Sequence, residues 1–171
     1  MSSNNQMGAG GQPLSAAVLP PNIFDPKLSG TDWYTYLVDG ANSPAPTGAG
    51  ANLAPAGVSN ATISIDSGTD FYLVGLQGFG MDNADPANSY DSSEIQVTLQ
   101  MNDSGSQRNL FSQPLPFPVI IGNGETPMRL IRPRLFRALS NIQFTFTNVS
   151  TAITFTHLWV ALWGYRKYSG S

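Results

Sequence analysis

Hydrophobic and polar residues alternate in two consecutive runs near the C-terminal end of the chain, between Asn141 and Tyr168. The run Asn141–Asn148 places isoleucine and two phenylalanines on one side and glutamine and two threonines on the other, which is the period of a half-buried β-strand. A turn-type cluster, Asn-Val-Ser-Thr, follows, and a second, strongly aromatic run extends from Ile153 to Tyr165. The pattern predicts a hairpin of two strands at the centre of an antiparallel sheet.

The second of these runs changes phase. Ile153 and Phe155 are its first apolar positions, but the aliphatic residues further on lie one position out of step: Leu158, Val160 and Leu162. A β-bulge near Thr156 would return that set to the core face. Alternatively both faces are covered, so that Trp159 and Trp163 contact a neighbouring subunit or the N-terminal arm, or they belong to one thick core. The second reading predicts an oligomer interface at the two tryptophans and a homotrimer or another closed ring.

Six other runs have the composition of strands: Thr31–Asp39, Thr62–Asp66, Phe71–Phe79, Glu94–Asn102, Leu110–Ile121 and Pro127–Phe136. Glu94–Asn102 alternates throughout, whereas Leu110–Ile121 contains three prolines and is predicted to lie on a sheet edge or to cross between sheets. Gly80–Ser93 is predicted to be a polar loop. No run shows a helical period over three turns. About eight strands with uneven connections predict an all-β fold, an antiparallel β-sandwich with the topology of an eight-stranded jelly roll.

The rest of the chain divides into an arm, a loop and a tail. Residues 1–30 are expected to form an extended N-terminal arm, because this polar segment cannot bury a core of its own. Its anchors would be the apolar residues around a Pro-Pro pair: Leu14, Val18, Leu19, Ile23 and Phe24. The β-sandwich domain covers 31–168 with a Pro/Ala/Gly-rich loop at 40–57, and 169–171 form a frayed tail.

Composition narrows the functional classes. Charged residues make up only 11% of the chain, so the surface must consist mainly of uncharged polar residues, as in proteins that pack against copies of themselves. The net charge of −3 gives no reason to expect a nucleic acid partner. No segment has the length of a membrane span, and no signal peptide is visible, so we expect synthesis in a cytoplasm and no membrane partner.

Catalytic and metal-binding groups are scarce. The chain has no cysteine and a single histidine, His157, which lies within a strand between apolar residues. We therefore expect no enzymatic activity and no cofactor. Asp82, Asp85, Asp91 and Glu94 gather in one loop, but their spacing does not match a calcium loop, and a solvated loop is the favoured interpretation.

Arginines gather in one short run, at Arg129, Arg132, Arg134 and Arg137, and make up half of the chain's eight basic residues. Because arginine binds carboxylates through two parallel hydrogen bonds, the run is predicted to contact a partner protein. The alternatives are a solvated strand face, on which arginine stems cover apolar surface, and a nucleic acid contact.

Three stretches stand out within Pro127–Phe136 and Ser140–Tyr168: an arginine-proline run, the strand Asn-Ile-Gln-Phe-Thr-Phe-Thr-Asn and the terminal Gly-Tyr-Arg-Lys-Tyr. In these stretches the chain resembles small jelly-roll structural proteins of tailed bacteriophages, of the type that decorate or cement the head. The resemblance covers about a quarter of the chain, and Gly40–Gly57 has no counterpart in it. It implies a virion protein, made in the host cytoplasm, that binds the major capsid protein or another virion protein, often as a trimer.

From the residues and the resemblance we expect a capsid decoration or cement protein that binds an assembled phage head through its arm and its arginine run. The alternative is a fibre, neck or tail component that recognises glycans. The aromatic residues available for stacking on sugars would then be Trp33, Tyr34, Tyr36 and Tyr90.

Overall fold

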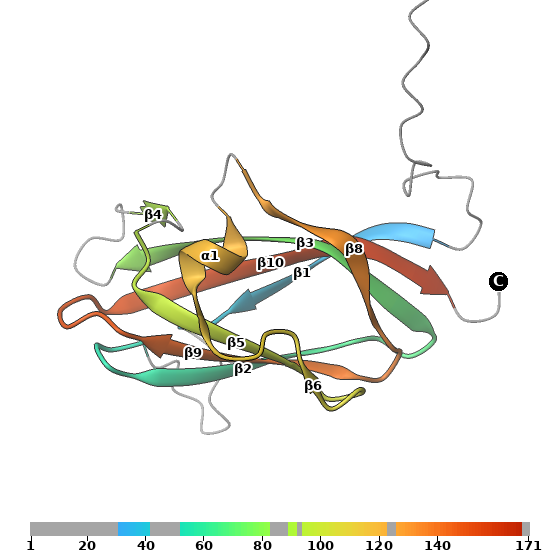
Figure 1. The fold of residues 1–171 in the computed structure, drawn as a ribbon, viewed down its shortest axis with the longest axis horizontal. Coiled ribbons are helices and arrows are strands. Elements are labelled where there is room, and N and C mark those ends of the chain that lie inside the picture. Colours follow the sequence, from blue (N-terminus) through green and yellow to red (C-terminus); the bar gives the residue numbers. More distant parts are fainter. Residues whose placement is uncertain (1–30, 42–51, 83–88, 92–93, 123–125, 169–171) are drawn as a thin grey trace, which may run out of the picture.

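The computed structural model describes residues 31–41, 52–82, 89–91, 94–122 and 126–168, where two antiparallel sheets pack face to face as a β-sandwich (Figure 1). The first sheet contains, in order, β1 (Thr31–Asp39), β10 (Phe155–Tyr168), β3 (Thr69–Asp82) and β4 (Ser89–Asp91), and β8 (Met128–Phe136) pairs with β3. The second contains β2 (Val58–Ser64), β9 (Asn141–Asn148), β5 (Val97–Asp103) and β6 (Arg108–Asn109), and β7 (Leu115–Pro116) pairs with β5. The predicted all-β sandwich is confirmed.

The core lies between the two sheets and is built from alternating strand positions. The alternation predicted for Glu94–Asn102 is confirmed, because its four apolar residues are all at most 2% exposed: Ile95, Val97, Leu99 and Met101. In β9, Phe144 and Phe146 are fully buried, and their rings stack with centroids 6.1 Å apart. The two-residue period therefore assigned the core side of both strands correctly.

The predicted hairpin of the last two runs is wrong. β9 lies between β2 and β5 in one sheet, and β10 lies between β1 and β3 in the other, so residues 149–154 cross the sandwich instead of turning within a sheet. Asn148 holds this crossing: its buried Nδ2 donates to the carbonyls of Leu53, Ala54 and Ile153, and its Oδ1 accepts the N–H of Ser150. These bonds tie the crossing to the backbone of Leu53 and Ala54, just before β2.

The proline-containing run adopts two structures. β7 pairs with the edge side of β5, as predicted, but Phe117–Ile121 then forms a short helix, α1, that the sequence did not reveal. The helix lies against β3 and β5 and buries Phe117, Ile120 and Ile121. It therefore closes an open edge of the sandwich, at the front of Figure 1.

The predicted loop Gly80–Ser93 is shorter than expected. β3 continues to Asp82 because β10 is long enough to pair with it up to that residue, and β4 pairs with the end of β3. The predicted arm and tail lie outside the described residues. Within the described part of the chain, no helix is long and apolar enough to cross a membrane.

Candidate functional site

The two outer faces of the sandwich differ in chemistry. The outward side chains of the second sheet are polar and uncharged over most of its area: Asn60, Thr62, Thr98, Gln100, Gln143, Thr145 and Thr147. The outward side chains of the first sheet, which we call the aromatic face, are mostly rings: Trp33, Leu37, Tyr72, Phe79, Trp159, Trp163 and Tyr165. Such an apolar area on the outside of a domain indicates a binding surface.

Three ring pairs build the aromatic face, and each joins β10 to a neighbouring strand. Trp33 of β1 lies 6.1 Å from Trp163, measured between ring centroids. On the other side, rings of β3 pack against Tyr165 and Trp159 with centroids 4.8 and 4.7 Å apart. Cross-strand aromatic pairs of this kind stabilise the sheet and hold the rings in fixed positions. The face is therefore ordered before any partner binds.

A shallow hollow of ≈ 220 Å³ lies within the aromatic face. It is lined by Leu37, Gln77, Gly78, Phe79, Trp159 and Ala161. Leu37 is 63% exposed and Phe79 is 45% exposed, so both project beyond the floor of the hollow. A side chain of a second molecule could enter it and bury both residues, which is the geometry of an anchor pocket.

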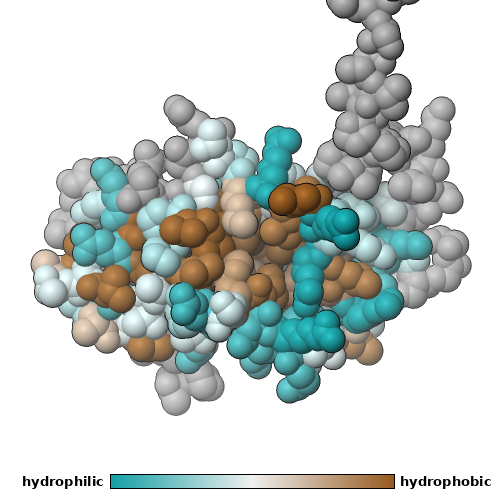
Figure 2. Space-filling model, in the orientation of Figure 1, coloured by the Kyte–Doolittle hydropathy of each residue, from teal (hydrophilic) through white to brown (hydrophobic). Residues whose placement is uncertain are grey.

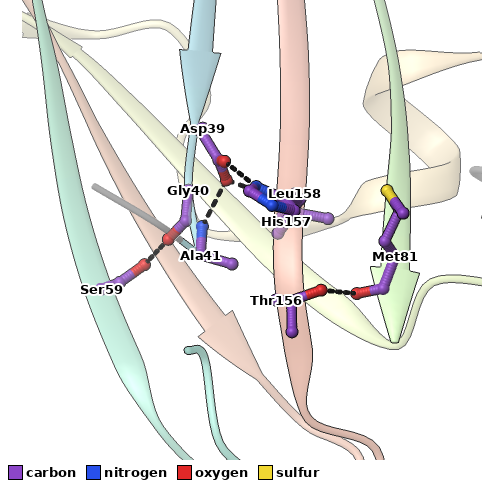
Figure 3. Close-up of polar contacts among 8 residues, drawn as sticks. All are labelled: Asp39, Gly40, Ala41, Ser59, Met81, Thr156, His157 and Leu158. Carbon is purple, nitrogen blue, oxygen red and sulfur yellow. Dashed lines mark hydrogen bonds and ion pairs between the residues drawn. The ribbon is translucent and has the colours of Figure 1, made fainter. Parts of the chain in front are cut away.

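A β-bulge turns the tryptophans outward, and this confirms the bulge interpretation of the phase change. In the pairing with β3, Phe155 lies opposite Asp82 and His157 lies opposite Met81, so Thr156 is the extra residue. The Thr156 hydroxyl donates to the carbonyl of Met81 at 3.3 Å (Figure 3). Beyond the bulge the even-numbered residues enter the core, and Trp159 and Trp163 lie on the outer face.

Asp39 fixes the other side of the bulge. Its Oδ1 accepts the N–H groups of Leu158 and Ala41, and its Oδ2 lies 2.6 Å from His157 Nδ1 (Figure 3). The His157 ring also stacks on Trp159, with an angle of 5° between the planes. These contacts give His157 a structural role in orienting Trp159.

Arg129 is the one member of the predicted arginine run that joins the aromatic face. Its guanidinium lies 5.7 Å from the ring centroid of Trp163, within the range of a cation–π interaction. Trp163 in turn lies over Gly75, where a Cβ atom would come within 2.3 Å of the ring. Gly75 therefore lets the indole lie flat against the sheet.

The other predicted arginines lie at an edge of the sandwich. Arg137 forms an ion pair with Asp70 at 3.1 Å, whereas Arg132 and Arg134 line a hollow beside β8. Arg108 of β6, which the sequence analysis did not single out, lines a second hollow together with Arg134 and Arg137. Arg108 is 21 or more residues from the predicted run, so only the tertiary structure could add it.

The aromatic residues suggested for glycan stacking do not share one surface. Trp33 is 53% exposed on the aromatic face, but the Arg166 guanidinium lies 3.1 Å from the ring centroid of Tyr34. Tyr36 is only 9% exposed, so its predicted availability is wrong, because it points inward against Phe71. Tyr90 is half-buried.

The predicted arm anchors lie outside the described residues, as does most of the acidic loop considered for calcium. Among the described residues, no group of three or more histidine, aspartate or glutamate side chains could hold a metal ion. Burial and the neighbouring Tyr72 raise the pKa of Tyr165, so this phenol stays uncharged at neutral pH. No known family model matches the chain, and a comparison with curated proteins finds no match.

Proposed function

We propose that this protein is a structural component of a viral shell, of the decoration or cement type, which associates with copies of itself through the aromatic face. The observation that carries the proposal is the contrast between the two outer faces, because one domain exposes polar side chains on one sheet and ordered rings on the other. A surface depleted of charge and rich in aromatic residues is typical of the centre of protein–protein interfaces.

A jelly-roll topology is part of this proposal. Successive long strands alternate between the two sheets: β1, β3, β8 and β10 belong to the first sheet, and β2, β5 and β9 belong to the second. The short strands are the exceptions, since β4 lies in the first sheet and β6 and β7 lie at the edge of the second. Counting β6 and β7 as one edge position gives eight strands arranged as two four-stranded sheets, which is the jelly-roll pattern. Viral shell proteins commonly use this architecture, and its broad sheet faces suit lateral contacts.

The self-association can be tested by removing the three most exposed side chains of the aromatic face. We expect a variant with Trp33→Ser, Leu37→Ser and Phe79→Ser to remain folded, because these residues are 45–63% exposed. The variant should sediment as a smaller species than the unchanged protein at the same concentration. The matched control is Val58→Ser on the outer side of the second sheet, where Val58 is 59% exposed. Equal sedimentation of all three proteins would refute the role of the aromatic face.

The place of the protein in a particle needs a separate experiment. Particles purified from cells that produce the protein should contain it, and electron microscopy of particles that carry a tagged copy should show the tag spread over the head. A tag found at the tail or neck would favour the alternative of a fibre, neck or tail component. Absence of the protein from particles would contradict the proposal.

A further inference from the structure

Two adjoining hollows with different chemistry lie at the edge of the sandwich formed by β8 and β6. The first, of ≈ 180 Å³, is mostly apolar and is lined by Leu73, Leu76, Leu110, Phe111, Leu130, Arg132 and Arg134. The second, which we call the polar hollow, has a volume of ≈ 360 Å³, and its lining includes Asp103, Gly105, Ser106, Arg108, Arg134 and Arg137. Arg134 belongs to both. Figure 2 looks onto this edge and shows hydrophilic side chains gathered over β8 and β6.

The polar hollow carries an excess of positive charge. Its own carboxylate, Asp103, is occupied by the turn that follows it: the N–H of Gly105 and the hydroxyl of Ser106 donate to it at 3.0 and 2.6 Å. Arg137 has its ion pair with Asp70. Arg108 is exposed, and the Nε of Arg134 is buried without a hydrogen-bond partner among the described residues. The hollow therefore suits one additional carboxylate, which could bind both guanidinium groups.

We propose that the occupant is the segment Phe24-Asp25 of the same chain, with the phenyl ring in the apolar hollow and the carboxylate in the polar one. Asp25 is the only acidic residue among residues 1–30, and an aromatic residue immediately precedes it. The apolar hollow has room for the ring, since a cavity of about 150 Å³ holds a benzene molecule. Phe24 and Asp25 are adjacent in the chain, just as the apolar hollow and the polar hollow are adjacent along the edge.

The chain is long enough to reach this place. Thr31 of β1 pairs with Lys167 of β10, and Lys167 pairs with Asp70 of β3. Neighbouring strands are about 4.8 Å apart, so Thr31 lies about 10 Å from Asp70. Asp70 binds Arg137 at the rim of the polar hollow. Figure 1 shows the first residues of β1 and the last residues of β8 at the same end of the sandwich. The six residues from Asp25 to Thr31 span up to about 20 Å when extended.

A nucleic acid fits these hollows less well. Nucleic acid binding needs a track of several phosphate contacts, whereas this edge offers one carboxylate-sized site beside Asp70 and Asp103, both negatively charged. The net charge of −3 also opposes the approach of a polyanion. Docking of Phe24-Asp25 would leave Leu14, Val18 and Leu19 free to contact a shell, and would fix the direction in which they leave the domain. The inference stands independently of the proposed function.

Cysteine cross-linking of the full chain tests the assignment, because the protein has no cysteine of its own. We expect the pair Asp25→Cys and Arg108→Cys to form a disulfide within one chain on mild oxidation, observed as a monomer on a non-reducing gel and by mass spectrometry. The control pair is Asp25→Cys with Gln143→Cys, on the polar outer face of the second sheet. Equal rates for the two pairs, or a disulfide found only between two chains, would overturn the proposal.

A charge exchange gives an independent readout. Lys27 is the only lysine in residues 1–30, so cleavage there by a lysine-specific protease reports whether this segment is docked. Asp25→Arg and Arg134→Glu should each speed this cleavage by about two- to fivefold, the range expected for losing a partly exposed ion pair, and the double variant should restore the original rate. Failure of the double variant to restore protection would refute the pairing. If Arg134→Glu proves unfolded, Phe24→Ser serves the same purpose without touching the domain.

Discussion

Replacing Asn148 by alanine should weaken the crossing between β9 and β10 more than any other change of a single polar side chain in that connection. Asn148 is fully buried, and its side chain makes four hydrogen bonds to backbone groups of two separate segments, Leu53-Ala54 and Ser150–Ile153, at 2.8–3.1 Å. The change to alanine removes all four bonds and leaves a small cavity.

The size of the stability loss depends on which hydrogen bonds the partners of Asn148 keep after the substitution. The three carbonyls that accept from Nδ2 each accept a second hydrogen bond, so losing Asn148 costs each of them about 0.5 kcal/mol, the low end for one bond. The buried N–H of Ser150 loses the Asn148 Oδ1 acceptor, and such an orphaned donor costs about 1–3 kcal/mol. We therefore expect the free energy of unfolding to fall by about 3 kcal/mol, which corresponds to a drop in Tm of about 6–12 °C for a domain of this size.

Chemical unfolding in urea, followed by tryptophan fluorescence, measures this loss directly. The matched control is Asn60→Ala, because the Asn60 side chain is exposed and accepts a bond from the Thr145 hydroxyl, so its loss should cost less than about 0.5 kcal/mol. Asn148→Asp separates hydrogen bonding from volume, because it keeps the shape but places a carboxylate against three carbonyl oxygens. It should be at least as unstable as the alanine variant at neutral pH. If Asn148→Ala costs no more than Asn60→Ala, the crossing is not held in the way described.

Three further predictions concern the core and the aromatic face. Gly75→Ala should lower stability by about 2–3 kcal/mol and alter tryptophan fluorescence, because the added Cβ would lie 2.3 Å from the Trp163 ring. Phe144→Ala should cost about 3–5 kcal/mol in urea unfolding, because the ring is fully buried; a loss below 1 kcal/mol would contradict the assigned core. Burial raises the pKa of Tyr36 and of Tyr165 above the value near 10 of the unfolded chain. The stability that these two phenols contribute should therefore be complete below about pH 10 and be lost as the pH rises through the raised pKa values. Ultraviolet titration of the phenols would refute this if both ionised as free tyrosines do.

The sequence determined the class of the fold and the core side of most strands. In Glu94–Asn102, and in Asn141–Asn148 up to Thr147, every second residue is apolar. Side chains of a strand point alternately to opposite faces, so the pattern itself specifies which of these residues are buried. The same rule indicated a bulge near Thr156 as one of two readings of the phase change, and the pairing of β10 with β3 decided in its favour.

Only the tertiary structure decided which strands are partners. The run from Asn141 to Tyr168 has the same alternation whether its arms pair with each other or face each other across the core, because alternation specifies the buried side and carries no information about the neighbouring strand. The choice depends on distant groups: the backbone of Leu53 and Ala54, which Asn148 binds, and the edges of β1 and β3, which pair with β10.

The sequence predicted only some of the residues of the candidate site. The phase of Trp159 and Trp163 left open whether they lie on an outer face or in one thick core. The strand pairing placed them on the outer face, and Trp33, Tyr72 and Phe79 joined them because β1 and β3 flank β10. The arginine run looked like one surface in sequence, but the backbone of β8 leaves the ladder between its pairings with Leu73 and Gly75. That irregularity separates Arg129, over Trp163, from the arginines at the sandwich edge, because a strand that departs from its ladder no longer orients its side chains by a two-residue period.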